Sequence, residues 1–315
     1  MSNKSVLLIG GGGTLGTYTG KELLNQGVFV DVICLEDNVS TDENLKFFKE
    51  NVTLEYLEEF LKNKHYDGIV NFIHYPEVDD YPPVHKLLIK HTSHLIVLSS
   101  YRVYADEKHP ITEDSPMLLD VLKDDEFMKT EKYAVSKTKL ERYLNSECIG
   151  ENWTVVRPVI SFSKKRFDLV THYKHSVLTK TKNGEIIPLP IDAKNLTAGL
   201  DWAGNSGKLI ANLLFKENVF GKAFTVSSAQ NLKWSEVAEI YSELVGAKFK
   251  WVSLDKYLKE NVHYDIYPLI YDRLFDRAID NTEILKATGL KSEDFTSIKD
   301  GIKIELELFK AENLI

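Results

Sequence analysis

Short apolar runs alternate with helix-like stretches along the first half of the chain. Val6–Ile9 is a continuous apolar run, as expected of a parallel strand that is buried on both faces. A helical pattern follows over Thr14–Gln26, and Gly27 is a residue of the kind that commonly ends a helix. The same alternation predicts strands at Val28–Leu35, Leu45–Phe48, Gly68–Ile73, Leu95–Ser99 and Trp153–Val156, and helices at Thr53–Lys64, Pro82–His91 and Thr130–Asn145. Strands separated by helices predict a Rossmann-type α/β fold with a doubly wound parallel sheet.

The second half of the chain has a less regular pattern. We expect helices over Asp168–Lys182, from Asn205 to Lys216, from Ser235 to Gly246 and from Thr296 onward, and strands at Ile186–Leu189, Phe224–Val226 and Phe249–Val252. No internal repeat or flexible linker separates the two halves. The sequence therefore predicts a first domain over residues 1–160 and a smaller C-terminal α/β lobe over residues 161–315. Elements at about 195–230 are expected to return to the first domain.

Composition disfavours several function classes. The net charge is −8 and the longest basic cluster is Lys164-Lys165-Arg166, so the basic surface typical of nucleic-acid binding is not expected. No apolar run approaches the roughly 20 residues of a membrane span, and the N-terminal apolar stretch is too short for a signal peptide. Cys34 and Cys148 fall on expected buried elements and do not suggest a disulfide. We therefore expect a cytoplasmic protein without a membrane or nucleic-acid partner.

A glycine-rich turn is the first candidate site. Gly10, Gly13 and Gly16 are spaced Gly-x-x-Gly-x-x-Gly, directly after a strand and at the start of a helix. In this context Gly10 permits the tight turn, Gly13 lets the backbone approach a pyrophosphate, and Gly16 lets the helix pack on the sheet. The helix N-terminus, with Thr14 and Leu15, then faces the negative charge. We interpret the turn as a dinucleotide site; the alternative is a glycine-rich turn that binds nothing.

The end of the second strand bears on which dinucleotide binds. A carboxylate at this place binds the adenosine ribose, and Glu36 lies twenty residues after Gly16. No Arg or Lys stands beside it in the sequence to receive a 2′-phosphate, so NAD is favoured over NADP. If the strand ends at Cys34 instead, Glu36 is an ordinary exposed carboxylate in a turn.

A Tyr-x-x-x-Lys pair supplies candidate catalytic chemistry. Tyr133 and Lys137 lie in an expected helix, where residues four apart share a face, and an adjacent ammonium lowers the pKa of a phenol toward the range of a general acid or base. Ser100 ends an expected strand at the carboxyl edge of the sheet, where ligands of open α/β folds bind. Tyr104 and Lys108 have the same spacing but lie in a turn-rich stretch, which indicates a chance match. The alternative for Tyr133 and Lys137 is a surface tyrosine with an ion-pairing lysine.

Together these motifs resemble the extended short-chain dehydrogenase/reductase family, the NAD-dependent epimerase/dehydratase group. The resemblance runs along Gly10–Gly16, Asp67–Phe72, Leu98–Tyr104, Tyr133–Lys137 and Val155–Pro158. It implies that Ser100 polarises the substrate oxygen, that Tyr133 moves the proton, and that Lys137 binds the nicotinamide ribose and tunes the tyrosine. It also implies that residues 1–160 form an NAD-binding Rossmann domain, that the later lobe binds substrate, and that the protein forms a homodimer through the Tyr133 helix. By the same resemblance, the remaining cofactor contacts are Asn51 and Val52 at adenine, with Phe72 and Pro158.

Two departures from the family pattern narrow the function. Nucleotide-sugar dehydratases of this family carry Asp-Glu directly after the catalytic hydroxyl residue, where this chain has Tyr101 and Arg102, so elimination of water is disfavoured. The segment from Phe72 to Leu95 is shorter than in nucleotide-sugar epimerases, and resembles a branch that includes chloroplast stem-loop-binding proteins, some of which bind RNA. His74 within it is interpreted as packed or hydrogen-bonded, since a lone histidine is seldom a ligand.

Two other patterns do not lead to a site. Gly204–Lys208 resembles a phosphate-binding loop, but Leu209 stands where Ser or Thr is required. No Cys or carboxylate cluster joins the histidines in the sequence, so no metal site is expected.

The preferred function is an NAD(P)-dependent oxidoreductase or epimerase that acts on a hydroxyl or keto carbon of a nucleotide-sugar or similar small substrate. A dinucleotide-binding regulator or sensor without turnover is the first alternative, and an RNA-binding member of the same family is the second. The intact set of Ser100, Tyr133 and Lys137 favours the enzyme over the sensor, and the acidic net charge disfavours RNA binding.

Overall fold

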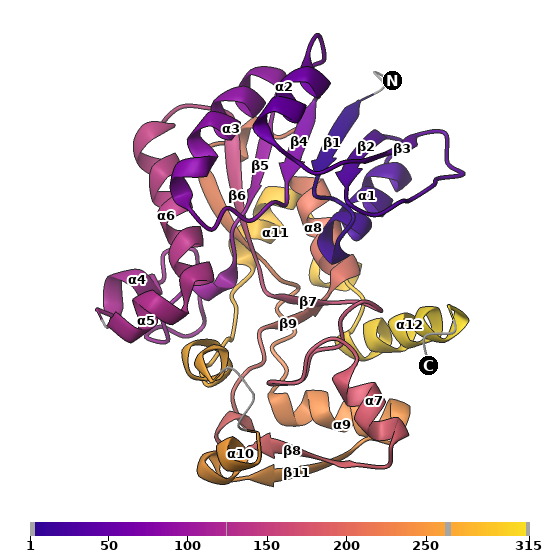
Figure 1. Ribbon diagram of the computed structural model, residues 1–315, viewed down its shortest axis with the longest axis vertical. Coiled ribbons are helices and arrows are strands. Elements are labelled where there is room, and N and C mark those ends of the chain that lie inside the picture. Colours follow the sequence, from indigo (N-terminus) through magenta and orange to yellow (C-terminus); the bar gives the residue numbers. More distant parts are fainter. Residues whose placement is uncertain (1–3, 124, 262–265, 313–315) are drawn as a thin grey trace.

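A seven-stranded parallel sheet forms the larger part of the molecule (Figure 1). The computed structural model describes residues 4–123, 125–261 and 266–312. Across the sheet the strands are β3 (Leu45–Lys49), β2 (Phe29–Cys34), β1 (Ser5–Ile9), β4 (Gly68–Asn71), β5 (Leu95–Leu98), β6 (Trp153–Pro158) and β10 (Lys222–Val226). The strand order reverses between β1 and β4, so the predicted doubly wound Rossmann-type fold is confirmed.

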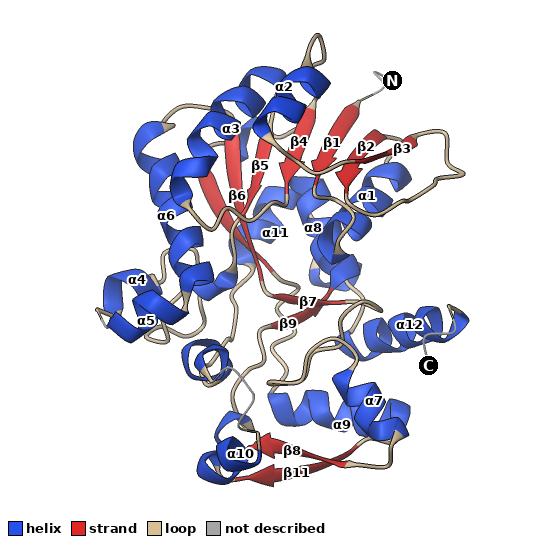
Figure 2. Ribbon diagram, viewed as in Figure 1, coloured by secondary structure: helices blue, strands red, loops and turns tan. Residues whose placement is uncertain are grey.

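Helices cover both faces of this sheet, because successive strand residues point to opposite sides (Figure 2). Leu7 and Val97 face a core shared with α2 (Leu54–Leu61), α3 (Tyr81–Leu88) and α6 (Lys132–Glu147). Leu8 and Ile96 face the opposite core, shared with α1 (Thr14–Asn25), α8 (Ala203–Leu213) and α11 (Thr282–Thr288). Strand β10 and helices α8 and α11 come from the C-terminal half of the chain, so residues distant in sequence complete the sheet and its cover.

A smaller lobe lies beyond the carboxyl ends of the strands (Figure 2). It contains the parallel pair β8 (Ile186–Pro190) and β11 (Lys248–Val252) with the helices α7 (Ser176–Lys182), α9 (Trp234–Val245) and α10 (Leu254–Glu260). A second parallel pair, β7 (Ile160–Phe162) and β9 (Leu200–Trp202), lies between the lobe and the large sheet, and α12 (Ile298–Ala311) packs against β9. The short helices α4 (Leu118–Val121) and α5 (Asp125–Thr130) lie beside α6.

The largest correction to the predicted elements concerns residues 168–175. They are not helical; α7 begins only at Ser176. Two tight turns precede it, closed by the backbone pairs Ser163–Arg166 and Leu169–His172. Val170 has a φ of +49°, in the left-handed region that an α-helix excludes.

Smaller corrections concern where helices begin and end. The helix predicted over residues 130–145 is α6, which begins two residues later at Lys132 and ends at Glu147, whereas Thr130 is the last residue of α5. Asn205 and Ser235 do not cap helices; they lie inside α8 and α9. The Asn205 amide instead donates 2.8 Å hydrogen bonds to Asp201 Oδ1 and Thr296 O, so a long-range contact replaces the expected cap. The cap of α12 is Ser297, one residue after the predicted start.

Candidate active site

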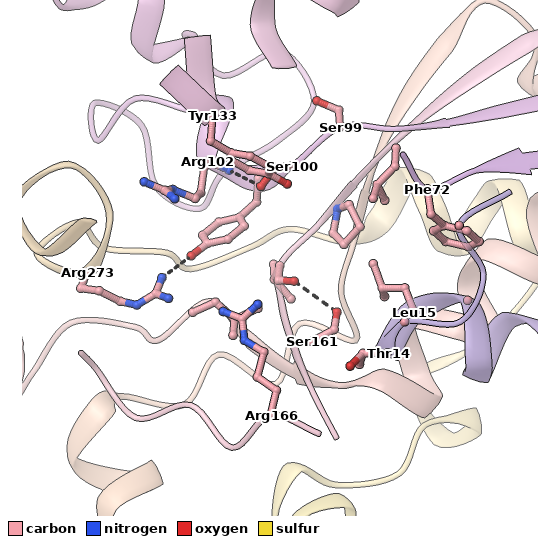
Figure 3. A pocket seen from close by; sticks show the side chains of 18 residues that line it. Thr14, Leu15, Phe72, Ser99, Ser100, Arg102, Tyr133, Ser161, Arg166 and Arg273 are labelled. Atoms are coloured by element: carbon pink, nitrogen blue, oxygen red, sulfur yellow. Dashed lines mark hydrogen bonds between the residues drawn. The ribbon is translucent and has the colours of Figure 1, made fainter. Parts of the chain in front are cut away.

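A cavity of about 550 Å³ lies at the carboxyl ends of the parallel strands, where the strand order reverses. Ligands of open α/β sheets bind at this place. Figure 3 shows side chains from both halves of the chain around it. The sequence-predicted residues that line it are Gly10, Gly13–Gly16, Phe72, Ser100, Tyr133 and Pro158. The other predicted site residues, Glu36, Asn51, Val52 and Lys137, are described but lie outside this lining.

The glycine-rich turn leaves open space at Gly13. Helix α1 begins at Thr14, and Gly13 before it has no side chain to bond the first N–H groups of the helix. A Cβ atom on Gly13 would meet no protein atom within 4 Å, whereas one on Gly16 would collide with the backbone of Gly11. Gly10 has a φ of +70°, which L side chains rarely adopt. An anionic group can therefore approach the turn at Gly13 and meet the positive end of α1.

A loop after β7 crosses this turn, and the sequence did not indicate it. Thr14 Oγ1 and Ser163 Oγ share a hydrogen bond of 3.0 Å, and Lys165 Nζ donates to Gly12 O at 2.7 Å. The loop thereby joins the segment that leads into the smaller lobe to the turn that begins α1.

Only one of the three residues predicted to contact the adenosine lies at the glycine-rich turn. The carboxylate of Glu36 lies against Gly12, since a Cβ atom on Gly12 would overlap its Oε2 atom. Asn51 is exposed after β3, and Val52 packs against the apolar core under α2. Of these three residues, the structure places Glu36 at the turn.

Ser100 and Tyr133 lie together at one end of the cavity (Figure 3). Ser100 Oγ accepts the N–H of Arg102 at 3.3 Å, which begins the single helical turn Tyr101–Val103 after β5. Burial raises the pKa of Tyr133, whereas a hydrogen bond with Ser100 and the cations Arg102 and Arg166 act in the opposite direction. The predicted lowering of this pKa is therefore wrong, because desolvation of the phenolate outweighs the cations.

Lys137 lies one turn along α6 and is buried. Its Nζ atom donates to Leu98 O at 2.5 Å and is 5.8 Å from the centroid of the Tyr133 ring. Burial lowers the pKa of Lys137 to about 8, and the carboxylate of Glu141 offsets part of this effect. Lys137 is therefore hydrogen-bonded to the end of β5 and lies outside the residues that line the cavity.

Comparisons with known proteins bear on the fold. No protein-family model matches the chain, and no curated protein matches it. An epimerase from Methanothermobacter thermautotrophicus has a similar structure, with a TM-score of 0.75 and 17% identity over 99% of this chain and 93% of the other. A UDP-glucose 4-epimerase from Thermus thermophilus, in complex with NAD, matches with a TM-score of 0.67 and 16% identity over 97% and 99% of the two chains. A dTDP-glucose 4,6-dehydratase from Bacillus anthracis, in complex with NAD, matches with a TM-score of 0.71 and 16% identity over 98% and 97%.

The chain has the fold of the extended short-chain dehydrogenase/reductases. The match spans both the parallel sheet and the smaller lobe of this extended dehydrogenase/reductase fold, since nearly the whole of each chain is covered. The fold therefore accounts for a cavity that lies between the sheet edge and the lobe.

Tyr104 is a residue of the buried core, not of the cavity. Its side chain is buried, its hydroxyl accepts from Arg157 Nη1 at 2.8 Å, and it shares a 2.7 Å hydrogen bond with Thr225 Oγ1. Lys108 is exposed and donates to Thr112 instead. Tyr104 is not among the residues that line the cavity.

His74 packs beside the tyrosine of the site. The two rings have centroids 4.8 Å apart, and His74 Nε2 shares a 2.9 Å hydrogen bond with Ser136 Oγ. Burial, with a smaller contribution from Lys137, lowers the pKa of His74. His74 is exposed, so the interpretation of it as a packed or hydrogen-bonded histidine is confirmed for the hydrogen bond.

Three arginines line the cavity and were missed as site residues. In the sequence, Arg102 was noted only because it departs from a family motif. Arg166 was noted only as part of a basic cluster. Arg273 gave no signal, because it belongs to the short helical segment Leu269–Arg273, far from every motif. Folding brings all three beside Ser100 and Tyr133.

One group of metal-ligand types also comes together. His85, Cys148 and Glu151 place ligand atoms within 4.8 Å of one another, near the amino ends of the strands. This corrects the sequence-based statement that no Cys or carboxylate joins a histidine. Both ring nitrogens of His85 have partners, Tyr81 at 3.1 Å and Glu151 at 2.6 Å. The absence of a metal site stays a prediction.

The predictions about a membrane and a homodimer concern parts of the molecule outside the cavity. Among the described residues, no helix is long and apolar enough to cross a membrane. The exposed residues of α6 are polar, namely Lys132, Lys139, Arg142, Asn145, Ser146 and Glu147. A homodimer through this helix stays a prediction, which sedimentation velocity would test.

Proposed function

We propose that the protein is an NAD-dependent oxidoreductase or epimerase that acts on a hydroxyl or keto carbon of a nucleotide-sugar or a similar small substrate. The observation that carries this proposal is a single cavity with the glycine-rich turn at one end and Ser100 and Tyr133 at the other (Figure 3). The UDP-glucose 4-epimerase and the dTDP-glucose 4,6-dehydratase that share this fold are both complexes with NAD.

The residues present fit NAD. The open space at Gly13 and the uncapped start of α1 would hold the pyrophosphate, and Glu36 beside Gly12 would accept from the adenosine ribose. Lys137 is outside the lining, and its Nζ atom would have to exchange its bond with Leu98 O for the nicotinamide ribose. When bound, NAD supplies the acceptor or donor of a hydride.

The side chains around the reacting carbon would handle the proton. Ser100 Oγ holds the substrate oxygen, and Tyr133 takes the hydroxyl proton as the carbon is oxidised, or returns it as a carbonyl is reduced. Arg102 and Arg166 favour the phenolate form of Tyr133, which the base step requires. At the dehydratase position, Tyr101 is bonded to Asp272 and Arg273 at 2.9 Å, which supports oxidoreduction or epimerisation over elimination of water.

A dinucleotide-binding regulator without turnover is the second candidate. The observation that favours it is that burial raises the pKa of Tyr133, while Lys137 Nζ donates to Leu98 O and is 5.8 Å from the centroid of the Tyr133 ring. Mass spectrometry of the nucleotide that co-purifies, followed by a screen of nucleotide-sugars for nicotinamide absorbance changes or epimerised products, separates the two. Turnover supports the enzyme, and a bound dinucleotide without turnover supports the regulator.

We expect the protein to bind NAD(H) more tightly than NADP(H). The Glu36 carboxylate at Gly12 would repel a 2′-phosphate on the adenosine ribose. Titration of nicotinamide fluorescence gives both affinities. Glu36→Ala should reduce the preference, whereas Asp37→Ala should not, since Asp37 pairs with Lys49 at 3.1 Å.

Tighter binding of NADP(H) than of NAD(H) would contradict this prediction, and Lys165 would explain it. Lys165 Nζ lies on Gly12 O and is the cation at this turn that the sequence did not indicate. Tighter binding of NADPH, lost in Lys165→Ala, would assign the 2′-phosphate to Lys165 and refute the choice of NAD.

A further inference from the structure

The charge of the cavity lining is one-sided. Of the described residues that line it, Arg102, Arg166 and Arg273 are the charged ones, and none is Asp or Glu. They come from three separate segments, although the whole chain has a net charge of −8. A cleft lined by one sign of charge attracts the opposite sign, so this lining favours an anionic ligand.

The arginines are not fully neutralised by their own ion pairs. Arg102, Arg273 and Arg277 lie within ion-pair distance of two carboxylates, Asp272 and Glu131. Burial acts to raise the pKa of Asp272, but the three arginines together hold it below its usual value. Among the described residues, these three guanidinium groups against two carboxylates leave one positive charge, which Arg102 and Arg273 share with Arg277 outside the lining. Arg166 is paired with Asp168 and does not change this balance.

Two arginines of this group lie at the reacting end of the cavity. Figure 3 shows Arg102 and Arg273 on the side of Tyr133, across from Thr14 and Leu15 of the glycine-rich turn. The guanidinium carbon of Arg102 is 5.7 Å from the centroid of the Tyr133 ring. The cofactor pyrophosphate would lie at the opposite end, so it does not account for these two arginines.

Arg102 has capacity for a further acceptor. Its Nη2 atom bonds Glu131, while its Nε atom is buried, lies 3.7 Å from Asp272 Oδ2 and has no hydrogen-bond partner among the described residues. Arg102 also stands where dehydratases of the resembled family carry a glutamate, which reverses the charge two residues after Ser100. A buried donor of this kind is costly unless an acceptor reaches it.

We propose that the substrate carries an anionic group, a carboxylate or a phosphate monoester, next to the carbon that reacts, and that Arg102 and Arg273 bind this group. The inference rests on the proposed function, because it assigns the substrate class at the same site. It places the negative charge beside Ser100 and Tyr133, and therefore favours acidic sugars or sugar phosphates over neutral sugars.

The test is a ligand-observed NMR titration of the full-length protein, with and without saturating NAD. The probes are acetate, methyl phosphate and acetamide, the last being a neutral analogue of acetate. We expect at least one anion to bind more tightly than acetamide in the presence of NAD. Arg102→Gln should weaken that binding by roughly ten- to a hundredfold, as expected when a charge-assisted hydrogen bond is removed. The tighter of the two anions identifies a carboxylate or a phosphate as the group.

Matched variants make the result specific. Arg142→Gln removes an exposed cation on α6 that pairs with Asp120 outside the cavity, and should leave anion binding unchanged. Arg102→Lys keeps the charge and should retain part of the affinity. Circular dichroism confirms that each variant is folded. Arg273→Gln is the second variant of the proposed anion site. Arg273 lies next to the buried Asp272, and if Arg273→Gln does not fold, the result for Arg102→Gln decides the test.

Three results would overturn the inference: anions that bind no better than acetamide, affinity unchanged in the folded Arg102→Gln protein, or displacement of both anions by NAD. The last would assign the arginines to the cofactor phosphates. If the protein binds neither NAD nor NADP, the proposed function fails separately, and the titration without a dinucleotide still reports on Arg102.

Discussion

Replacing Tyr133 with phenylalanine is expected to lower turnover by roughly 10²–10⁴-fold, the usual contribution of a positioned general acid or base. The hydroxyl that is removed lies in the cavity with Ser100, while the remaining ring keeps its packing against His74. Affinity for NAD should change little, because the glycine-rich turn lies at the other end of the cavity. Steady-state kinetics on a substrate found by the screen, with NADH affinity from fluorescence, measure both quantities.

Tyr104→Phe is the matched control, because it removes the same hydroxyl from the other Tyr-x-x-x-Lys pair. Its hydroxyl bonds Arg157 and Thr225 in the core, so its loss should reduce the free energy of unfolding by about 1–3 kcal/mol, measured by chemical denaturation. Turnover of the folded variant should stay within a few-fold of the original. Equal losses of turnover in the two variants would show that Tyr133 is the wrong tyrosine.

Gly13→Val is expected to abolish dinucleotide binding and leave the fold intact. A Cβ atom at this position meets no protein atom within 4 Å, so the valine side chain would fit the protein but project from the turn into the space for the pyrophosphate. Isothermal calorimetry with NAD should show no detectable heat, while the melting temperature without ligand stays close to that of the original protein.

Gly20→Ala provides the comparison within the same helix. A Cβ atom on Gly20 would lie 3.4 Å from Leu8 Cδ1, an ordinary packing contact on the face of α1 away from the cavity. This variant should bind NAD as the original does. A folded Gly13→Val protein with unchanged NAD affinity would remove the glycine-rich turn from the cofactor site.

The features that the sequence predicted are those that local physics determines. A doubly buried strand is a continuous apolar run, and the spacing of Gly10, Gly13 and Gly16 fits a strand–turn–helix junction without knowledge of the rest of the fold. The edge of a parallel sheet then brings Ser100 and the Tyr133 helix to the same cavity. Each of these inferences needs only neighbours in sequence and the rule that parallel strands end at one edge.

The features that the sequence did not reveal depend on contacts between distant segments. Arg273 reaches the cavity because its Nε atom donates to Val170 O at 2.9 Å, across about a hundred residues of chain. The turns at residues 168–175 were mistaken for a helix, since apolar spacing alone cannot show that Val170 adopts a left-handed conformation. The pKa of Tyr133 was misjudged because burial, which sequence spacing does not report, outweighs the nearby cations.

The two hydrogen bonds from the loop after β7 to the glycine-rich turn bear on the order in which ligands bind. Ser163 and Lys165 hold Thr14 Oγ1 and Gly12 O, polar atoms that flank the open space at Gly13. A dinucleotide that displaced those bonds would release the loop that carries Arg166, which also lines the cavity. Binding of the cofactor would then change how Arg166 meets a substrate anion. By linkage, each ligand would change the affinity of the other by the same factor.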